Sequence, residues 1–259
     1  MNLAERLERT QFDLFWVPPI VRVFDRGGVL AISSKRPMPQ LNQGVRVDVS
    51  VAGWRQTLRE ACAAFAPGLG RWFVPDPDDR PELVSALRSE RFEGGHAFEA
   101  RVLQTDRELA AGPTEVVRVS TLEGLRDVMS VGRRAFMVPL SFTDNELQKQ
   151  LELGVGPHAR ARRYLIYEHG EPVCAGGMNV YPELSMGLLW AGGTVPEARG
   201  RGHYRALLAA RLADARSLGL AWVGLYARVD TSAPVVAKHG FERVGDMVIY
   251  AAPEFADPT

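Results

Sequence analysis

Hydrophobic and polar positions alternate along the chain in two distinct rhythms. At 45–51 a valine stands at every second position between polar residues, which is the period of a half-buried strand. At 203–218 apolar side chains recur every three or four positions, which is the period of a helix with one buried face. Segments of both kinds fill most of the sequence, so an α/β (α+β) fold class is expected.

The same periodicities, together with glycine and proline punctuation, predict the other elements. A threonine followed three residues later by a glutamate, at 143 and 146, forms a capping box that places a helix start there. The expected helices are 2–15, 54–65, 81–91, 122–136, 143–153, 203–218 and 233–239. The expected strands are 20–24, 29–33, 45–51, 71–74, 97–103, 115–119, 164–167, 172–181, 186–195, 222–227 and 241–251.

A polar stretch at 104–113 that ends in Gly-Pro divides the chain. We therefore predict two units, 1–110 and 114–253. The end of the first unit echoes the end of the second, because both run strand, proline-started helix, Phe-Glu, strand, at 71–103 and 221–251. Either the first unit is a worn, shortened copy of the second or the likeness is a coincidence of common elements.

Composition and charge exclude several classes of protein. Hydrophobic residues make up 46% and charged residues 24% of the 259 positions, as in ordinary globular proteins. The formal net charge of +0 removes the bulk attraction expected of a nucleic-acid binder. Two cysteines and scattered histidines give neither a disulfide framework nor a metal cluster. The charged N-terminus and the absence of a long apolar run predict a cytoplasmic location, without a membrane or nucleic-acid partner.

The segment 194–208, which runs TVPEARGRGHYRALL, predicts a strand end, a two-glycine loop and a helix start. Gly200 and Gly202 permit a tight turn with inward N–H groups, and the following helix adds free amides and a positive dipole end. Such a loop binds anions, a phosphate above all. The three spaced glycines of a dinucleotide fold and the Gly-Lys-Ser/Thr of a P-loop are both missing. A plain surface turn is the alternative.

The residues Arg199-Gly-Arg-Gly202-His-Tyr204 resemble the acyl-CoA pyrophosphate loop of the GNAT N-acetyltransferase superfamily, which has Arg or Gln, two residues, Gly, one residue, then Gly or Ala. Tyr204 departs from that pattern, since a small residue is usual there. The order of elements over 114–253 and the ending Gly240-Phe241 are also similar to the family. The resemblance implies a central mixed, mostly antiparallel sheet flanked by helices, with an N-terminal partial repeat that lacks the cofactor loop.

The resemblance implies one acetyl-CoA (coenzyme A) site per chain, in the second unit. The strand end would hold the pantetheine arm and the loop amides the pyrophosphate. Arginines 211 and 216 are expected on a solvated helix face, and a bulge within 190–194 is expected to free a backbone N–H as an oxyanion donor. The expected cofactor-binding residues are Thr194, Val195, Arg199, Gly200, Arg201, Gly202, His203, Tyr204 and Arg205.

The residues that would transfer protons in the reaction are the least clearly indicated by the sequence. Many members of the family have a tyrosine about four residues before the terminal glycine, and Val236 stands there. Side chains of suitable chemistry lie elsewhere, each with a purely structural alternative as a core aromatic, a turn residue or a helix-end residue. These candidate catalytic residues are Tyr226, Glu183, Asp230 and His239.

Two functions follow from the resemblance. The first is an N-acetyltransferase that moves an acetyl group from acetyl-CoA to a primary amine of a small molecule or peptide, with a homodimer left open. The second is a catalytically silent acyl-CoA-binding protein with a sensing or regulatory role, as Val236 suggests. A purely structural scaffold would have little reason to keep Arg199, Gly200 and Gly202 together.

Overall fold

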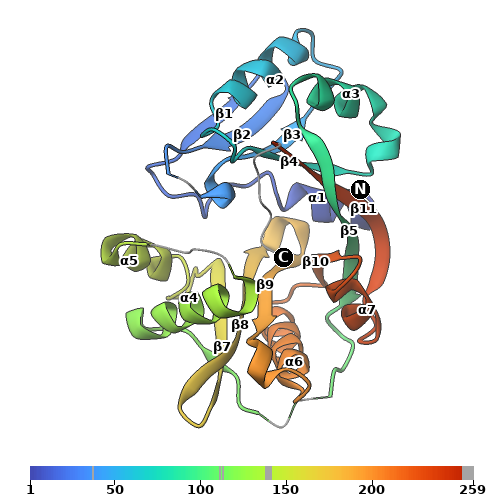
Figure 1. The fold of residues 1–259 in the computed structure, drawn as a ribbon. Coiled ribbons are helices and arrows are strands. Elements are labelled where there is room, and N and C mark those ends of the chain that lie inside the picture. Colours follow the sequence, from blue (N-terminus) through green and yellow to red (C-terminus); the bar gives the residue numbers. More distant parts are fainter. Residues whose placement is uncertain (37, 111, 113, 138–141, 253–259) are drawn as a thin grey trace.

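The computed structural model describes residues 1–252 except 37, 111, 113 and 138–141. Its described strands form one 11-stranded sheet that runs through both parts of the chain (Figure 1). The helices are α1 (Leu3–Arg9), α2 (Trp54–Ala63), α3 (Pro81–Ser89), α4 (Leu122–Phe136), α5 (Asp144–Glu152), α6 (His203–Ser217) and α7 (Ser232–Ala237). The strands are β1 (Arg22–Arg26), β2 (Val29–Ser33), β3 (Gln43–Val47), β4 (Arg71–Pro75), β5 (Glu93–Gln104), β6 (Val117–Arg118), β7 (Ala161–Glu168), β8 (Glu171–Tyr181), β9 (Met186–Thr194), β10 (Trp222–Arg228) and β11 (Glu242–Ala251).

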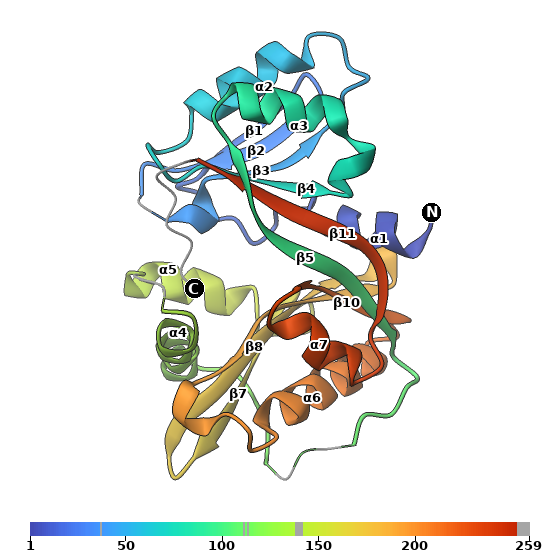
Figure 2. The same cartoon turned by 45° about the vertical axis from the view of Figure 1, so that its right-hand side comes forward.

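The order of the strands shows that the two halves exchange their last strands. It runs β1-β2-β3-β4-β11-β5-β10-β9-β8-β7-β6, so that β11 lies between β4 and β5. The first half therefore gives β5 to the second half as the neighbour of β10, and receives β11 as the neighbour of β4. Figure 2 shows β5 and β11 side by side as they pass from one half to the other.

The two halves share an arrangement of strands and helices, which supports the first of the two interpretations of the echo in the sequence, a shortened copy. Each half has one parallel pair among its described strands, β3 with β4 and β9 with β10. The helix after the first strand of each pair begins at a left-handed glycine, Gly53 with φ 81° and Gly202 with φ 83°. The expected fold class and partial repeat are confirmed.

Helices cover both faces of the second half. Successive residues of a strand point to opposite faces, and on β9 Gly192 faces Tyr204 of α6 whereas Gly193 faces Phe136 of α4. Helix α4 thus packs on one face and α6 on the other, as Figures 1 and 2 show from two sides. No helix among the described residues is long and apolar enough to cross a membrane.

The buried cores also depend on the exchanged strands. Tyr250 of β11 packs in the core of the first half with Trp72, which is 1% exposed. Leu103 of β5 packs in the core of the second half. Each core is therefore completed by a strand that the other half supplies.

The alternating valines at 45–51 gave a wrong strand end. The strand β3 covers Gln43–Val47 and stops before Asp48, whose carboxylate accepts hydrogen bonds from the Ser50 backbone N–H at 3.0 Å and its hydroxyl at 2.6 Å. These bonds lower the pKa of Asp48 and close a turn. Val49 is consequently 43% exposed, so this valine does not pack in the core although it continues the alternating pattern.

Gly44 of β3 is a sensitive point of the first core. A Cβ there would lie 1.9 Å from the Trp72 ring, and a buried indole has little room to move. We expect Gly44→Ala to lower the free energy of unfolding by about 1–3 kcal/mol, as overpacking usually does. Urea unfolding measures this loss. Gly95→Ala is the control, since a Cβ there meets the Ile249 carbonyl oxygen at 3.5 Å; equal stability of the two variants would contradict the packing argument.

Candidate active-site cleft

Strands β9 and β10 run together and then part. Their parallel pairing covers Met186 with Trp222 through Leu188 with Gly224. Both strands continue further, to Thr194 and Arg228. The opening between them exposes backbone groups that elsewhere in a sheet are paired.

A β-bulge lies on β9 beside this opening. Trp190 pairs with Gly177 and Gly193 pairs with Ala175, so that two residues, Ala191 and Gly192, stand opposite one. Ala191 has φ 46°, the left-handed region that a residue with a side chain rarely adopts. The bulge expected within 190–194 is confirmed, and such a bulge leaves backbone groups outside the ladder.

The glycine loop follows β9 and leads into α6. Gly200 and Gly202 have φ 78° and 83°, and no side chain caps the start of α6. The first N–H groups of a helix have no partner within it. They remain available, beside the positive end of the helix dipole, to an anion in the cleft.

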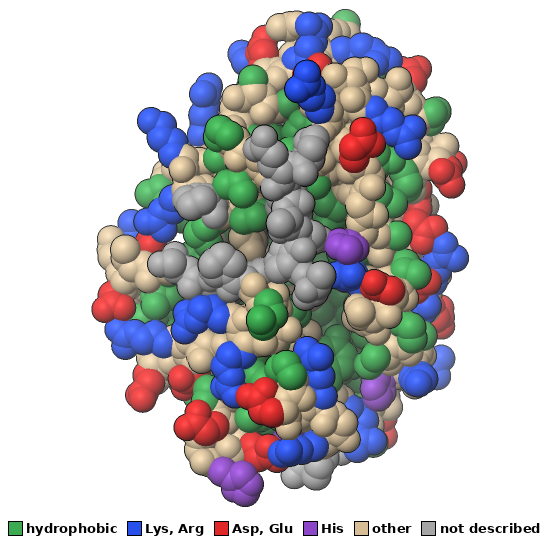
Figure 3. Space-filling model, viewed as in Figure 1, with side chains coloured by type: hydrophobic (Ala, Val, Ile, Leu, Met, Phe, Trp, Pro, Cys, Tyr) green, Lys and Arg blue, Asp and Glu red, His purple; other side chains and the backbone are tan. Residues whose placement is uncertain are grey.

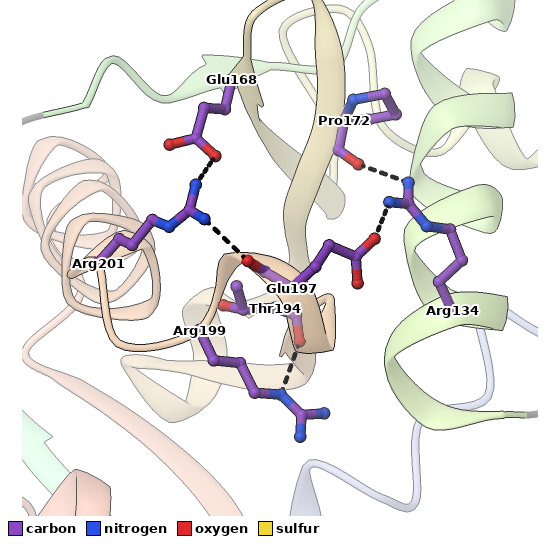
Figure 4. A network of polar contacts seen from close by, with 7 residues as sticks. All are labelled: Arg134, Glu168, Pro172, Thr194, Glu197, Arg199 and Arg201. Carbon is purple, nitrogen blue, oxygen red and sulfur yellow. Dashed lines mark hydrogen bonds and ion pairs between the residues drawn. The ribbon is translucent and has the colours of Figure 1, made fainter.

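Side chains of the loop hold it to its neighbours (Figure 4). The Arg199 Nε donates to the Thr194 carbonyl oxygen at 3.1 Å. Arg201 pairs with Glu168 at 2.5 Å and donates to the Glu197 carbonyl oxygen at 3.0 Å. Glu197 in turn pairs with Arg134 of α4. These side-chain contacts tie the loop to β9, to α4 and to Glu168, so that its backbone is held in one conformation.

The opening, the bulge and the loop line one cleft of about 1360 Å³. Its walls come from both halves, with Leu69 and Phe98 from the first and Leu189 and Leu225 from the second. Figure 3 shows hydrophobic, basic and acidic side chains interspersed on the face of the molecule that is turned to the viewer in Figure 1. Among the described residues that line the cleft there is no Asp or Glu; the cationic ones are Arg71, Arg199, Arg205, Arg211 and Arg228.

Most of the expected cofactor-binding residues reach this cleft. Thr194, Arg199, Gly200, Gly202, His203, Tyr204 and Arg205 all line it. Val195 is fully buried in the core, and Arg201 is turned toward Glu168. Their roles toward a cofactor stay predictions.

The structure separates the four candidate catalytic residues. Tyr226 and His239 line the cleft. Burial raises the pKa of Tyr226, while burial and the charge of Arg205 lower the pKa of His239. Asp230 is exposed and pairs with Arg228 at 2.9 Å, and Glu183 lies in a short 3-10 helix at the other end of β9. Neither carboxylate lines the cleft, so the four are not brought together.

Arg211 lies in the interior of the protein, where its sequence pattern did not predict it. It was expected on a solvated helix face, but it is 1% exposed and lines the cleft. Tyr204 precedes Arg211 by seven residues and so lies on the same face of α6. Its ring is also turned inward, beneath Gly192. The signal was present in the sequence, because Arg211 falls on the stripe that Tyr204, Leu208 and Ala215 define.

Comparison with solved structures identifies the fold. A GCN5-related N-acetyltransferase from Kribbella flavida has a TM-score of 0.70 at 16% identity, covering 98% of this chain and 96% of its own. A tandem GNAT protein from the clavulanic acid biosynthesis pathway has a TM-score of 0.62 at 14% identity, over 96% and 88%. A GCN5-related N-acetyltransferase from Sphaerobacter thermophilus has a TM-score of 0.58 at 15% identity, over 89% and 75%. No family model and no curated protein matches the sequence.

The protein thus has the GNAT fold, in an arrangement of two related halves. The expected resemblance is confirmed at the level of fold, and the tandem GNAT protein covers both halves as well.

Proposed function

We propose that the protein is an acyl-CoA-dependent N-acyltransferase of the acetyltransferase type, with acetyl-CoA as its simplest donor and a primary amine of a small molecule or peptide as acceptor. The observation that supports this best is the meeting of three features in one cleft: the parted strands, the β9 bulge and the glycine loop at the start of α6. The GNAT fold of the chain agrees with it.

The cleft offers each part of a coenzyme A thioester a suitable partner. The amides at the start of α6 suit the pyrophosphate. The unpaired edge of β9 suits the amide groups of the pantetheine arm, which can bind as an added strand does. The bulge then lies where the thioester carbonyl would come, with a backbone N–H for the charge that develops on its oxygen.

The reaction is a simple exchange of bonds. The amine nitrogen attacks the thioester carbonyl carbon, a C–N bond forms, the C–S bond breaks, and the amine proton is lost as coenzyme A leaves as its thiol. The attacking amine must be neutral. A cleft whose described lining is cationic and free of carboxylates lowers the pKa of a bound ammonium group and favours that form.

We place a single coenzyme A site in the chain. A second hollow, of about 650 Å³, lies in the first half between α1, the end of β3 and the start of α3. Its described lining has more carboxylates than arginines: Glu5, Glu8, Asp48, Asp79 and Glu82 against Arg9, Arg46 and Arg80. This excess of negative charge disfavours a pyrophosphate, whereas the described lining of the second half's cleft has no carboxylate.

The silent alternative remains a specific second candidate. Val236, at the position where the family resemblance implies an acid, is fully buried in the core and does not line the cleft. A protein that binds acyl-CoA without turnover would tolerate this. Catalysis would also tolerate it, because a thiolate is a good leaving group and positioning supplies much of the rate.

Calorimetry with acetyl-CoA, followed by a thiol-release assay over a panel of amines, tests the proposal. We expect binding at micromolar concentrations and thiol release with at least one amine. Binding with no release over the whole panel would favour the silent acyl-CoA-binding protein. Absence of binding would contradict both functions.

A further inference from the structure

Arg211 is a buried cation without an anion. Its Nε donates to the Leu207 carbonyl oxygen at 3.3 Å and its Nη1 to the Gly177 carbonyl oxygen at 3.2 Å. Its Nη2 has no hydrogen-bond partner among the described residues, and none of their carboxylates pairs with it. A guanidinium in this state costs stability, because burial removes its water and the two carbonyl oxygens replace only part of the lost hydrogen bonds and none of the countercharge.

The free side of Arg211 faces the bulge. A Cβ on Gly192 would lie 3.1 Å from Nη2, and one on Gly176 would lie 3.1 Å from Nη1. Both positions are glycine, so the strand backbone leaves room for the charged group. The ring of Tyr204 closes the same space, with its Cε2 at 3.0 Å from that Gly192 position. The guanidinium therefore stands under the part of the cleft wall that the acyl end of a thioester would reach.

An acetyl group has no charge that could pair with this cation. A short acyl chain that ends in a carboxylate supplies such a charge. A charge-assisted hydrogen bond from Nη2 to a carboxylate would supply the missing anion. We propose that Arg211 selects the acyl group, and that the preferred donor is the coenzyme A thioester of a short dicarboxylic acid. This inference rests on the proposed function and narrows its acyl donor.

The test compares succinyl-CoA with butyryl-CoA, which match in chain length and differ by the carboxylate. Calorimetry needs no acceptor. We expect the protein to bind succinyl-CoA about tenfold or more tightly than butyryl-CoA, the range of a hydrogen bond to a charged group. Equal affinities, or tighter binding of butyryl-CoA, would overturn the inference and leave the proposed function intact. If neither thioester binds, the proposed function itself fails.

Arg211→Met separates recognition from structure, because methionine fills a similar apolar volume without charge. We expect it to remove the preference for succinyl-CoA over butyryl-CoA, and to raise Tm by about 2–4 °C through loss of the uncompensated charge. Arg216→Met on the same helix is the control, since Arg216 contacts the Thr105 and Arg107 carbonyl oxygens away from the bulge, and it should keep the preference. If Arg211→Met keeps the preference, Arg211 does not select the acyl group. If this variant fails to fold, the comparison of thioesters on the unaltered protein still decides.

Discussion

Replacing Gly202 with glutamate is expected to abolish acetyl-CoA binding, with an affinity loss of at least about 100-fold, because a like charge facing a like charge costs several kcal/mol. Gly202 starts α6 and lines the cleft. A glutamate there would put a carboxylate at the amides that we assign to the pyrophosphate. Calorimetry with acetyl-CoA measures the loss, and unchanged affinity would remove the basis of the proposed function.

Backbone strain must be separated from charge in this test. At φ 83° any residue other than glycine is strained, so some loss of stability is expected whatever the side chain. Gly53→Glu is a matched control: Gly53 has φ 81°, also starts a helix, has nothing within 4 Å of an added Cβ, and lies outside the cleft. Both variants should lose similar stability in thermal unfolding, and only Gly202→Glu should lose acetyl-CoA. An equal loss of affinity in both would assign the effect to strain.

The sequence predicted the elements of the second half well because local signals determine them. The helix Leu122–Phe136 has the predicted ends, and the Thr143 capping box starts α5 as expected. Gly240 takes a left-handed φ of 84° and Phe241 is buried, as the short terminal helix required. In each case the residues that decide the structure are neighbours in the chain.

The pairing of distant strands and the burial of single side chains could not be predicted from local sequence patterns. Nothing in 93–104 or 242–251 shows that each strand pairs with the other half, because pairing partners far apart in sequence leave no local period. The burial of Arg211 is of the same kind: a charge on a helix predicts exposure, and only Gly176 and Gly192 on two strands make room for it. The separation of Glu183 and Asp230 from the cleft likewise depends on how strands are placed.

The strand exchange bears on the division of the chain. The predicted units 1–110 and 114–253 share two strands, and β11 has both of its neighbours, β4 and β5, in the first unit. The division into these two units therefore stays a prediction that experiment can decide. The hydrogen-bonded edges and core surfaces that separation would expose argue for one cooperative body.

Neither half, expressed alone as 1–110 or 114–259, is expected to fold. Without the first half β10 loses β5, β11 loses both neighbours, and the core loses Leu103, which is 4% exposed in the whole chain. Without the second half, Trp72 loses the cover of Tyr250. Circular dichroism and gel filtration should show aggregated or unfolded halves, and refolding them together should give a one-to-one complex that melts cooperatively. A full-length chain cut by protease at a site inserted within 108–112 is the control, and it should stay folded. A monomeric 114–259 fragment with its own sharp thermal transition would contradict the argument, because it would mean that the exchanged strands add to each half without completing it.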